Sequence, residues 1–125
     1  MLASAKIVAF GATTDSARSR AFYEHVLGLT FLQEDAFACV FDAGGVQLRI
    51  QKVQNLTPHP HTMLGWSVSS IIDVVTSLAR KGVVIERYGF LEQDDRGVWT
   101  SPSGAKIAWM KDPDGNLLSV TQPSL

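Results

Sequence analysis

The chain has 125 residues, which is a common size for one domain, and its 46% hydrophobic and 18% charged residues exclude a disordered protein. Eleven basic and twelve acidic side chains leave a net charge of −1, which excludes the strongly basic surface of a nucleic-acid-binding protein. No apolar run approaches a membrane span, and the first residues lack the features of a signal peptide. Cys39 is the only cysteine, so no internal disulfide can form and we expect a cytoplasmic protein.

The first helix is predicted over residues 16–27, after an apolar strand over 6–13. Asp15 is a suitable N-cap for this helix, and Gly28 is a suitable residue to end it. Helical periodicity places its apolar residues on one face, which would be buried against the rest of the protein. This predicted face consists of Ala17, Ala21, Phe22, Val26 and Leu29.

Three strands are expected after this helix, over 31–33, 37–41 and 46–51. In the last of them, apolar residues alternate with polar ones, which indicates one face packed on the helix and one open face. The apolar residues are Val46, Leu48 and Ile50, and the polar ones are Gln47, Arg49 and Gln51. Cys39 lies in the apolar middle strand, where a buried thiol is expected rather than a nucleophile.

The second half of the chain repeats this order after a proline-containing linker over 55–61. A helix is predicted over 71–81, because apolar residues recur at helical spacing between an N-cap at Ser70 and a stop at Gly82. A polar stretch over 92–104 is expected to be a long loop or a weak strand. The remaining strands are predicted over 63–68, 83–88, 105–111 and 116–122.

The repeated order of strand, helix and three strands predicts two diverged modules. Val8 corresponds to Met63 in this repeat, and Arg49 corresponds to Ser119. Module one covers about 1–54 and module two about 62–125. A module of about 60 residues is marginally stable by itself, so we expect the two to form one α+β domain.

Two motifs resemble signatures of the vicinal oxygen chelate superfamily, which contains glyoxalase I, bleomycin- and fosfomycin-resistance proteins and extradiol dioxygenases. The segment from Asp15 to Gly28 looks like its first-helix signature, and Lys111–Asn116 resembles the signature before its last strand. The resemblance implies paired βαβββ modules whose sheets form an open cup that binds a small molecule. It also implies a homodimer, because members with one domain usually assemble in pairs.

Metal-dependent members of this superfamily carry their ligands on the first and last strands of each module. By resemblance, those positions are Val8, Arg49, Met63 and Ser119. The enzymes have histidine, glutamine or glutamate there, whereas valine offers no donor and arginine is a permanent cation. We therefore expect neither a metal nor another cofactor, and the sequence identifies no catalytic residue.

The residues expected to bind a ligand are those that the pattern and the resemblance place in or beside the cup. They are Val8, Phe10, Gln47, Arg49, His61, Met63, Trp109 and Ser119. Arg49 could clamp an anionic oxygen through two parallel hydrogen bonds. Alternatively, it could belong to a solvated polar face or pair with a carboxylate such as Glu86 or Asp42. His61 would lie at the rim. Trp99 or Trp109 could stack on a flat ligand, or belong to the core or to the dimer interface.

Three functions remain open on the sequence. The first is binding of a small planar or anionic molecule without a metal, either to sequester it or in a metal-free reaction. The second is a metal-dependent lyase or dioxygenase of the glyoxalase I type, with ligands drawn from His59, His61, Glu86 and Glu92. The third is a module that binds another protein. Whether the protein is an enzyme is left open.

Overall fold

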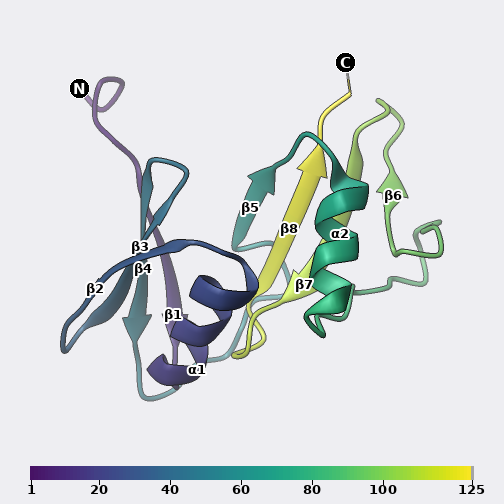
Figure 1. Ribbon diagram of the computed structural model, residues 1–125. Helices are drawn as coiled ribbons and strands as arrows, with labels where there is room; N and C mark the ends of the chain where they lie inside the picture. The colour runs from purple at the N-terminus through teal and green to yellow at the C-terminus, as the bar shows by residue number, and fades with distance from the viewer. Residues whose placement is uncertain (125) are drawn as a thin grey trace. The chain divides into compact units, whose positions relative to one another are not determined.

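The computed structural model describes residues 1–124 and divides into two compact units, Met1–Pro58 and a second one that begins at His59. Each unit contains one four-stranded mixed sheet and a helix that follows its first strand (Figure 1). The α+β class and the two modules expected from the sequence are therefore confirmed. No helix among the described residues combines the length and the apolar character that crossing a membrane requires.

The two units share one strand order. The first sheet has the order β1-β4-β3-β2, with β1 parallel to β4, and the second has the order β5-β8-β7-β6, with β5 parallel to β8. The elements of the first unit are β1 (Val8–Thr13), α1 (Ser16–Ala21), the π-helical turn η1 (Phe22–Val26), β2 (Thr30–Glu34), β3 (Ala38–Ala43) and β4 (Val46–Lys52). Those of the second are β5 (Leu64–Ser67), α2 (Ile71–Arg80), β6 (Trp99–Thr100), β7 (Lys106–Lys111) and β8 (Leu117–Gln122).

The predicted first helix is a short α-helix that continues as a π-helical turn. The Asp15 side chain caps it as expected, accepting a hydrogen bond from the Arg18 N–H at 3.2 Å. Further along, the Leu27 N–H donates to the Phe22 carbonyl at 2.9 Å, which is the i to i+5 bond of a π-helix. Gly28 then takes a φ of 77°, the left-handed conformation that ends the segment.

The predicted buried face of this helix was partly wrong. Ala17 and Ala21 are exposed, whereas Ser19, Phe22 and Tyr23 are buried. The Tyr23 ring lies 5.7 Å from the Phe41 ring, and a buried aromatic side chain removes far more apolar surface from water than an alanine does. The large ring therefore determines which face turns toward the sheet, and the small Ser19 fits beside it.

A charged pair ties β2 to β4 near the edge of the first sheet. The Lys52 Nζ lies 2.7 Å from the Glu34 carboxylate, and this hydrogen bond lowers the pKa of Glu34 and raises the pKa of Lys52. The neighbouring Asp35 accepts hydrogen bonds from the Phe37 and Ala38 N–H groups, and these lower its pKa. Burial raises the pKa of the Cys39 thiol, as the charge of Glu34 also does, so the thiol is protonated and inert at neutral pH.

Stability should fall as the pH is lowered from neutral. The folded pKa values of Glu34 and Asp35 lie below their ordinary values of about 4, so their contribution is present above those values and is lost as the pH falls through the folded ones. The contribution of Lys52, whose pKa is raised, is lost only as the pH rises through its folded value. Urea unfolding between pH 3 and 7 measures the acid effect.

Lys52→Met should weaken this acid dependence, because Glu34 loses the hydrogen bond that lowers its pKa. Lys6→Met removes an exposed lysine without removing that bond and serves as the matched control. The same acid dependence in Lys52→Met and in the unaltered chain would contradict this account.

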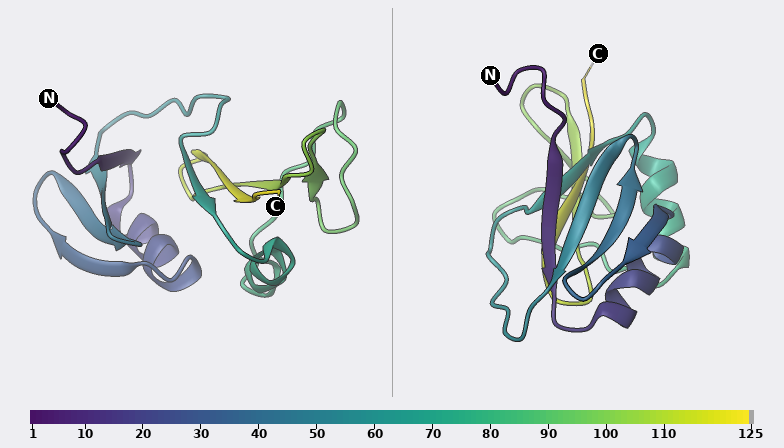
Figure 2. Two further views of the ribbon diagram at one scale, coloured as in Figure 1. Left: turned by 90° about the horizontal axis from the view of Figure 1, so that it is seen from above. Right: turned by 90° about the vertical axis from the view of Figure 1, so that its left-hand side faces the viewer.

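The helix of the second unit lies on one side of its sheet (Figure 2, left). Ser70 caps α2 as predicted, accepting a hydrogen bond from the Asp73 N–H at 3.4 Å, and Gly82 follows the helix with a φ of 84°. The apolar stripe of α2 is buried, and so are the alternate residues of β7 and β8 that it covers. These buried residues are Ile71, Val75 and Leu78 on the helix, with Ala108, Met110, Leu118 and Val120 on the strands.

The strand predicted over 83–88 is absent, although the chain there alternates like one. One bond ties the segment to β7, from the Glu86 N–H to the Trp109 carbonyl at 2.8 Å. Hydrogen bonds to the Gln93 side chain take the place of those to a neighbouring strand. This side chain accepts from the Tyr88 N–H and donates to the Glu86 carbonyl, both at 2.8 Å. A strand does form in the polar stretch that follows, as the two-residue β6.

Gly97→Ala should destabilise the second unit more than Gly104→Ala. Both glycines have a φ near +90°, where a side chain costs about 1–2 kcal/mol, but a Cβ on Gly97 would also lie 2.5 Å from the Ile85 Cγ2. A Cβ on Gly104 meets nothing closer than 3.5 Å. We expect losses of about 2–3 kcal/mol for Gly97→Ala and about 1 kcal/mol for Gly104→Ala in urea unfolding. Equal losses would contradict the close contact with Ile85.

Candidate functional site

Four of the expected binding residues lie together on the open face of the first sheet. Val8 pairs with Gln47 and Phe10 pairs with Arg49 across the parallel strands β1 and β4. The alternate residues of β4 are buried on the opposite side, where Tyr23 of η1 packs on the sheet. Val8, Phe10, Gln47 and Arg49 therefore form one surface, which we call the N-terminal open face.

Arg49 lies half-buried between apolar side chains on this face. Its neighbours across the strands are Phe10, which is 51% exposed, and Val40, which is buried. In the part of the chain that the structure describes, Arg49 has no ion-pair partner. Asp42 and Glu86, the carboxylates expected as alternative partners of Arg49, have other partners. The Asp42 side chain accepts from the Gly45 N–H at 2.8 Å, and the Glu86 carboxylate lies 3.5 Å from the Lys111 Nζ.

An unpaired guanidinium beside an aromatic ring is suited to an organic anion. Its parallel N–H groups match the two oxygens of a carboxylate or phosphate, and Phe10 supplies apolar surface next to them. A shallow pocket of about 370 Å³ adjoins this face, and Lys6, Val8, Leu32, Asp42 and Gln47 are among its lining residues.

Aromatic side chains gather on the open face of the second sheet. The Trp109 ring lies 6.1 Å from Trp99 and 5.6 Å from Tyr88, and the Phe90 ring lies 5.7 Å from Tyr88. Trp109 alternates along β7 with the buried Ala108 and Met110, so it points away from the side that α2 covers. We call Tyr88, Phe90, Trp99 and Trp109 the aromatic cluster.

Of the aromatic cluster, Trp99 and Trp109 were expected from the sequence, whereas Tyr88 and Phe90 were not. Their spacing of two residues was the available signal, because it places both on one side of an extended segment. Burial raises the pKa of Tyr88, and the charge of Glu86 acts in the same direction, so the phenol is protonated at neutral pH and can donate a hydrogen bond.

Ser119 lies on β8 of the second sheet, and Met63 lies directly before β5. Ser119 pairs with Trp109 on one side and with Gly65 on the other, and it is buried. A Cβ on Gly65 would lie 2.7 Å from the Ser119 Oγ, so the glycine reflects close packing of β5 on β8. The Met63 N–H donates to the Leu117 carbonyl at 2.8 Å, just before β5 begins.

His61 lies in the exposed segment before β5, where its ring stacks on His59 with centroids 5.1 Å apart and planes 15° apart. Glu92 is also exposed, and Glu86 is engaged with Lys111. Residues 1–124 contain no group of three or more histidine, cysteine, aspartate or glutamate side chains that could hold a metal ion.

The residues at the superfamily's metal-ligand positions do not fit a divalent cation. Val8 has no donor atom, and the Arg49 guanidinium would repel a cation. Met63 has only a soft thioether, and the remaining donor is the hydroxyl of Ser119. We therefore derive no reaction step through a metal in this chain.

A sequence profile of the glyoxalase/bleomycin resistance protein/dioxygenase superfamily matches residues 9–120. The chain belongs to this superfamily. The match spans both units and confirms the resemblance drawn from the two motifs. No curated protein shows significant sequence similarity to the chain.

Solved structures of superfamily proteins have the same fold. A bleomycin resistance determinant encoded on transposon Tn5 is 20% identical with a TM-score of 0.76, and the match covers 98% of this chain and 100% of that one. A bleomycin-binding protein complexed with bleomycin is 20% identical with a TM-score of 0.73, over 97% and 100% of the two chains. Lactoylglutathione lyase from Agrobacterium tumefaciens is 18% identical with a TM-score of 0.70, over 95% and 93%.

Proposed function

We propose that this superfamily member binds a small, planar organic anion without a metal. The observation that carries the proposal is Arg49, an unpaired guanidinium next to Phe10 on the N-terminal open face. The anionic group would bind Arg49 and Gln47, with Val8 and Phe10 as apolar neighbours. Considered by itself, the second unit offers a separate surface, where the aromatic cluster would stack on flat rings. Ser119 lies on β8 of this unit, and Met63 and His61 lie in the segment before β5.

On the N-terminal open face, sequestration fits the residues better than catalysis. A general acid or base needs a titratable group at the site, and a nucleophile needs an activating neighbour. The N-terminal open face offers an arginine, an amide and apolar side chains, and none of these is the histidine, carboxyl or thiol group that such catalysis commonly uses. The similar fold of a bleomycin-binding protein complexed with bleomycin supports binding as the function. We also propose that both modules form a single domain, that the protein is a homodimer and that it is located in the cytoplasm.

Arg49→Ala should weaken the binding of 2-naphthoate, a planar carboxylate, by about 10-fold or more. Hydrogen bonds to a charged group contribute about 1.5–3 kcal/mol, and alanine removes both of them. Arg49→Lys keeps the charge but not the paired donors, so its affinity should lie between the two. Isothermal titration in the presence of EDTA gives the dissociation constants.

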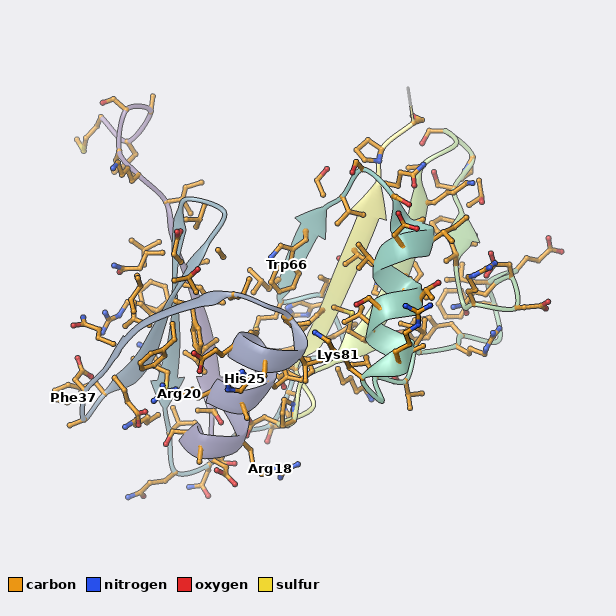
Figure 3. The ribbon with its side chains drawn as sticks, in the orientation of Figure 1. Arg18, Arg20, His25, Phe37, Trp66 and Lys81 are labelled. Atoms are coloured by element: carbon orange, nitrogen blue, oxygen red, sulfur yellow. The ribbon has the colours of Figure 1, made fainter. Side chains whose placement is uncertain are left out.

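Arg18→Ala is the matched control, because Arg18 is an exposed arginine on α1 in the same unit (Figure 3). It should bind 2-naphthoate like the unaltered chain. Unchanged affinity in Arg49→Ala, or binding that needs an added divalent metal, would refute the proposal.

A further inference from the structure

The second unit has a groove that lies away from its aromatic cluster. The groove has a volume of about 670 Å³ and lies between α2, the segment after it and the turn at Asp95 and Arg96. In the segment after α2, Ile85 and Arg87 line the groove. The residues that alternate with them have other partners, because Glu86 pairs with Lys111 and Tyr88 packs on Trp109. The groove and the aromatic cluster therefore lie on opposite sides of this segment.

The floor of the groove is aliphatic. Val75 and Ala79 of α2 face Val83 and Ile85 of the following segment, and none of the lining residues is aromatic. The volume is in the range of pockets that hold small organic molecules, about 300–1,000 Å³. An alkyl chain matches such a floor better than a flat ring system does.

The rim of the groove is positive. Three arginines line it, Arg80 from α2, Arg87 from the following segment and Arg96 from the turn, against one carboxylate, Asp95. The Arg87 Nη2 donates to the carbonyls of Asp94 and Asp95, at 3.0 and 2.9 Å, so it also fixes the turn that carries Arg96. Among residues 1–124, Arg80 and Arg96 have no ion-pair partner.

We propose that this groove binds a soluble alkyl phosphate monoester. One guanidinium is enough to pair with both oxygens of a carboxylate, whereas a phosphate dianion has three oxygens and can use donors from several arginines. The phosphate binds at Arg80 and Arg96, and the alkyl chain lies on the aliphatic floor. This site is independent of the open-face function proposed above.

The test is a titration of the ¹⁵N-labelled 125-residue chain with n-hexyl phosphate, followed by amide chemical shifts. We expect saturable shifts confined to residues around the groove. Inorganic phosphate has only the anionic group of this ligand, and n-hexanol has only its alkyl chain. Each should therefore bind at least about 10-fold more weakly than n-hexyl phosphate. Shifts by n-hexyl phosphate that match those of inorganic phosphate, or no shifts at the groove, would overturn the proposal.

Variants test the contribution of the arginine charges and that of the aliphatic floor separately. Arg80→Gln and Arg96→Gln should each weaken n-hexyl phosphate binding about 10-fold, while Arg18→Gln, which removes an exposed arginine of the first unit, should leave it unchanged. Ala79→Gln fills the groove without changing its charge and should weaken binding at least as much as the arginine variants do. Equal affinity in all four variants would overturn the proposal.

Two further results distinguish this site from other sources of binding. In Arg49→Ala, the amide shifts that n-hexyl phosphate causes around the groove should be the same as in the unaltered chain, because Arg49 does not line the groove. Failure of the open-face proposal therefore leaves this result unaffected. Binding to vesicles containing phosphatidic acid without binding to n-hexyl phosphate would show a membrane surface instead of a soluble ligand, and would refute the assignment.

Discussion

Phe41→Ala should lower the free energy of unfolding by about 3–5 kcal/mol, the usual loss when a large buried aromatic side chain is removed. Phe41 is fully buried on β3, and its ring lies 5.7 Å from Tyr23 and 5.8 Å from Phe31. The substitution removes the ring contact between Tyr23 of η1 and β3 and leaves a cavity between the helical segment and the sheet. Urea unfolding monitored by circular dichroism measures the change.

Phe37→Ala makes the same chemical change four residues earlier, at a side chain that is 75% exposed (Figure 3). It should cost less than about 1 kcal/mol, because little apolar surface is buried there. Similar losses in both variants would contradict the packing of the first unit, and with it the support for the N-terminal open face on the other side of the sheet.

Asp112→Ala should lower the free energy of unfolding by about 3–4 kcal/mol, because three donors lose their acceptor at a buried turn. The Asp112 Oδ1 accepts from the N–H groups of Asp114 and Asn116, at 3.0 and 2.9 Å, and its Oδ2 accepts from the Asn116 Nδ2 at 2.8 Å. Asp112 is 5% exposed, so water cannot easily replace it. This turn sets the register of β7 and β8, which carry Trp109 and Ser119.

Asp95→Ala removes an exposed carboxylate from another turn of the same unit and is the matched control. It should change the free energy of unfolding by no more than about 0.5 kcal/mol. A loss below about 1 kcal/mol in Asp112→Ala, measured by the same urea titration, would contradict the role of its three hydrogen bonds.

Most of the fold could be predicted because its signals are local. Alternation along β4 identified the face that carries Arg49, and the N-caps and glycine stops located both helices. The repeat was predicted to align Val8 with Met63 and Arg49 with Ser119. The strand registers agree with this alignment. Phe10, two residues after Val8, pairs with Arg49, and Gly65, two residues after Met63, pairs with Ser119.

The misses depend on contacts between distant residues. The buried face of the first helix is determined by the packing of Tyr23 on Phe41, which helical periodicity does not show. Residues 83–88 alternate like a strand, yet the Gln93 side chain takes the place of a neighbouring strand there. Tyr88 reaches the aromatic cluster because the Glu86 N–H bonds to Trp109, a partner 23 positions further along the chain.

Metal-independent binding of a planar anion is tested by an amide and indole chemical-shift titration with 2-naphthoate in the presence of EDTA. We expect saturable shifts at Phe10, Gln47 and Arg49, and at the indole N–H groups of Trp99 and Trp109. Those shifts should be lost at the N-terminal open face in Arg49→Ala. Shifts that appear only after a divalent metal is added, or that leave both open faces unperturbed, would contradict metal-independent binding of a planar anion.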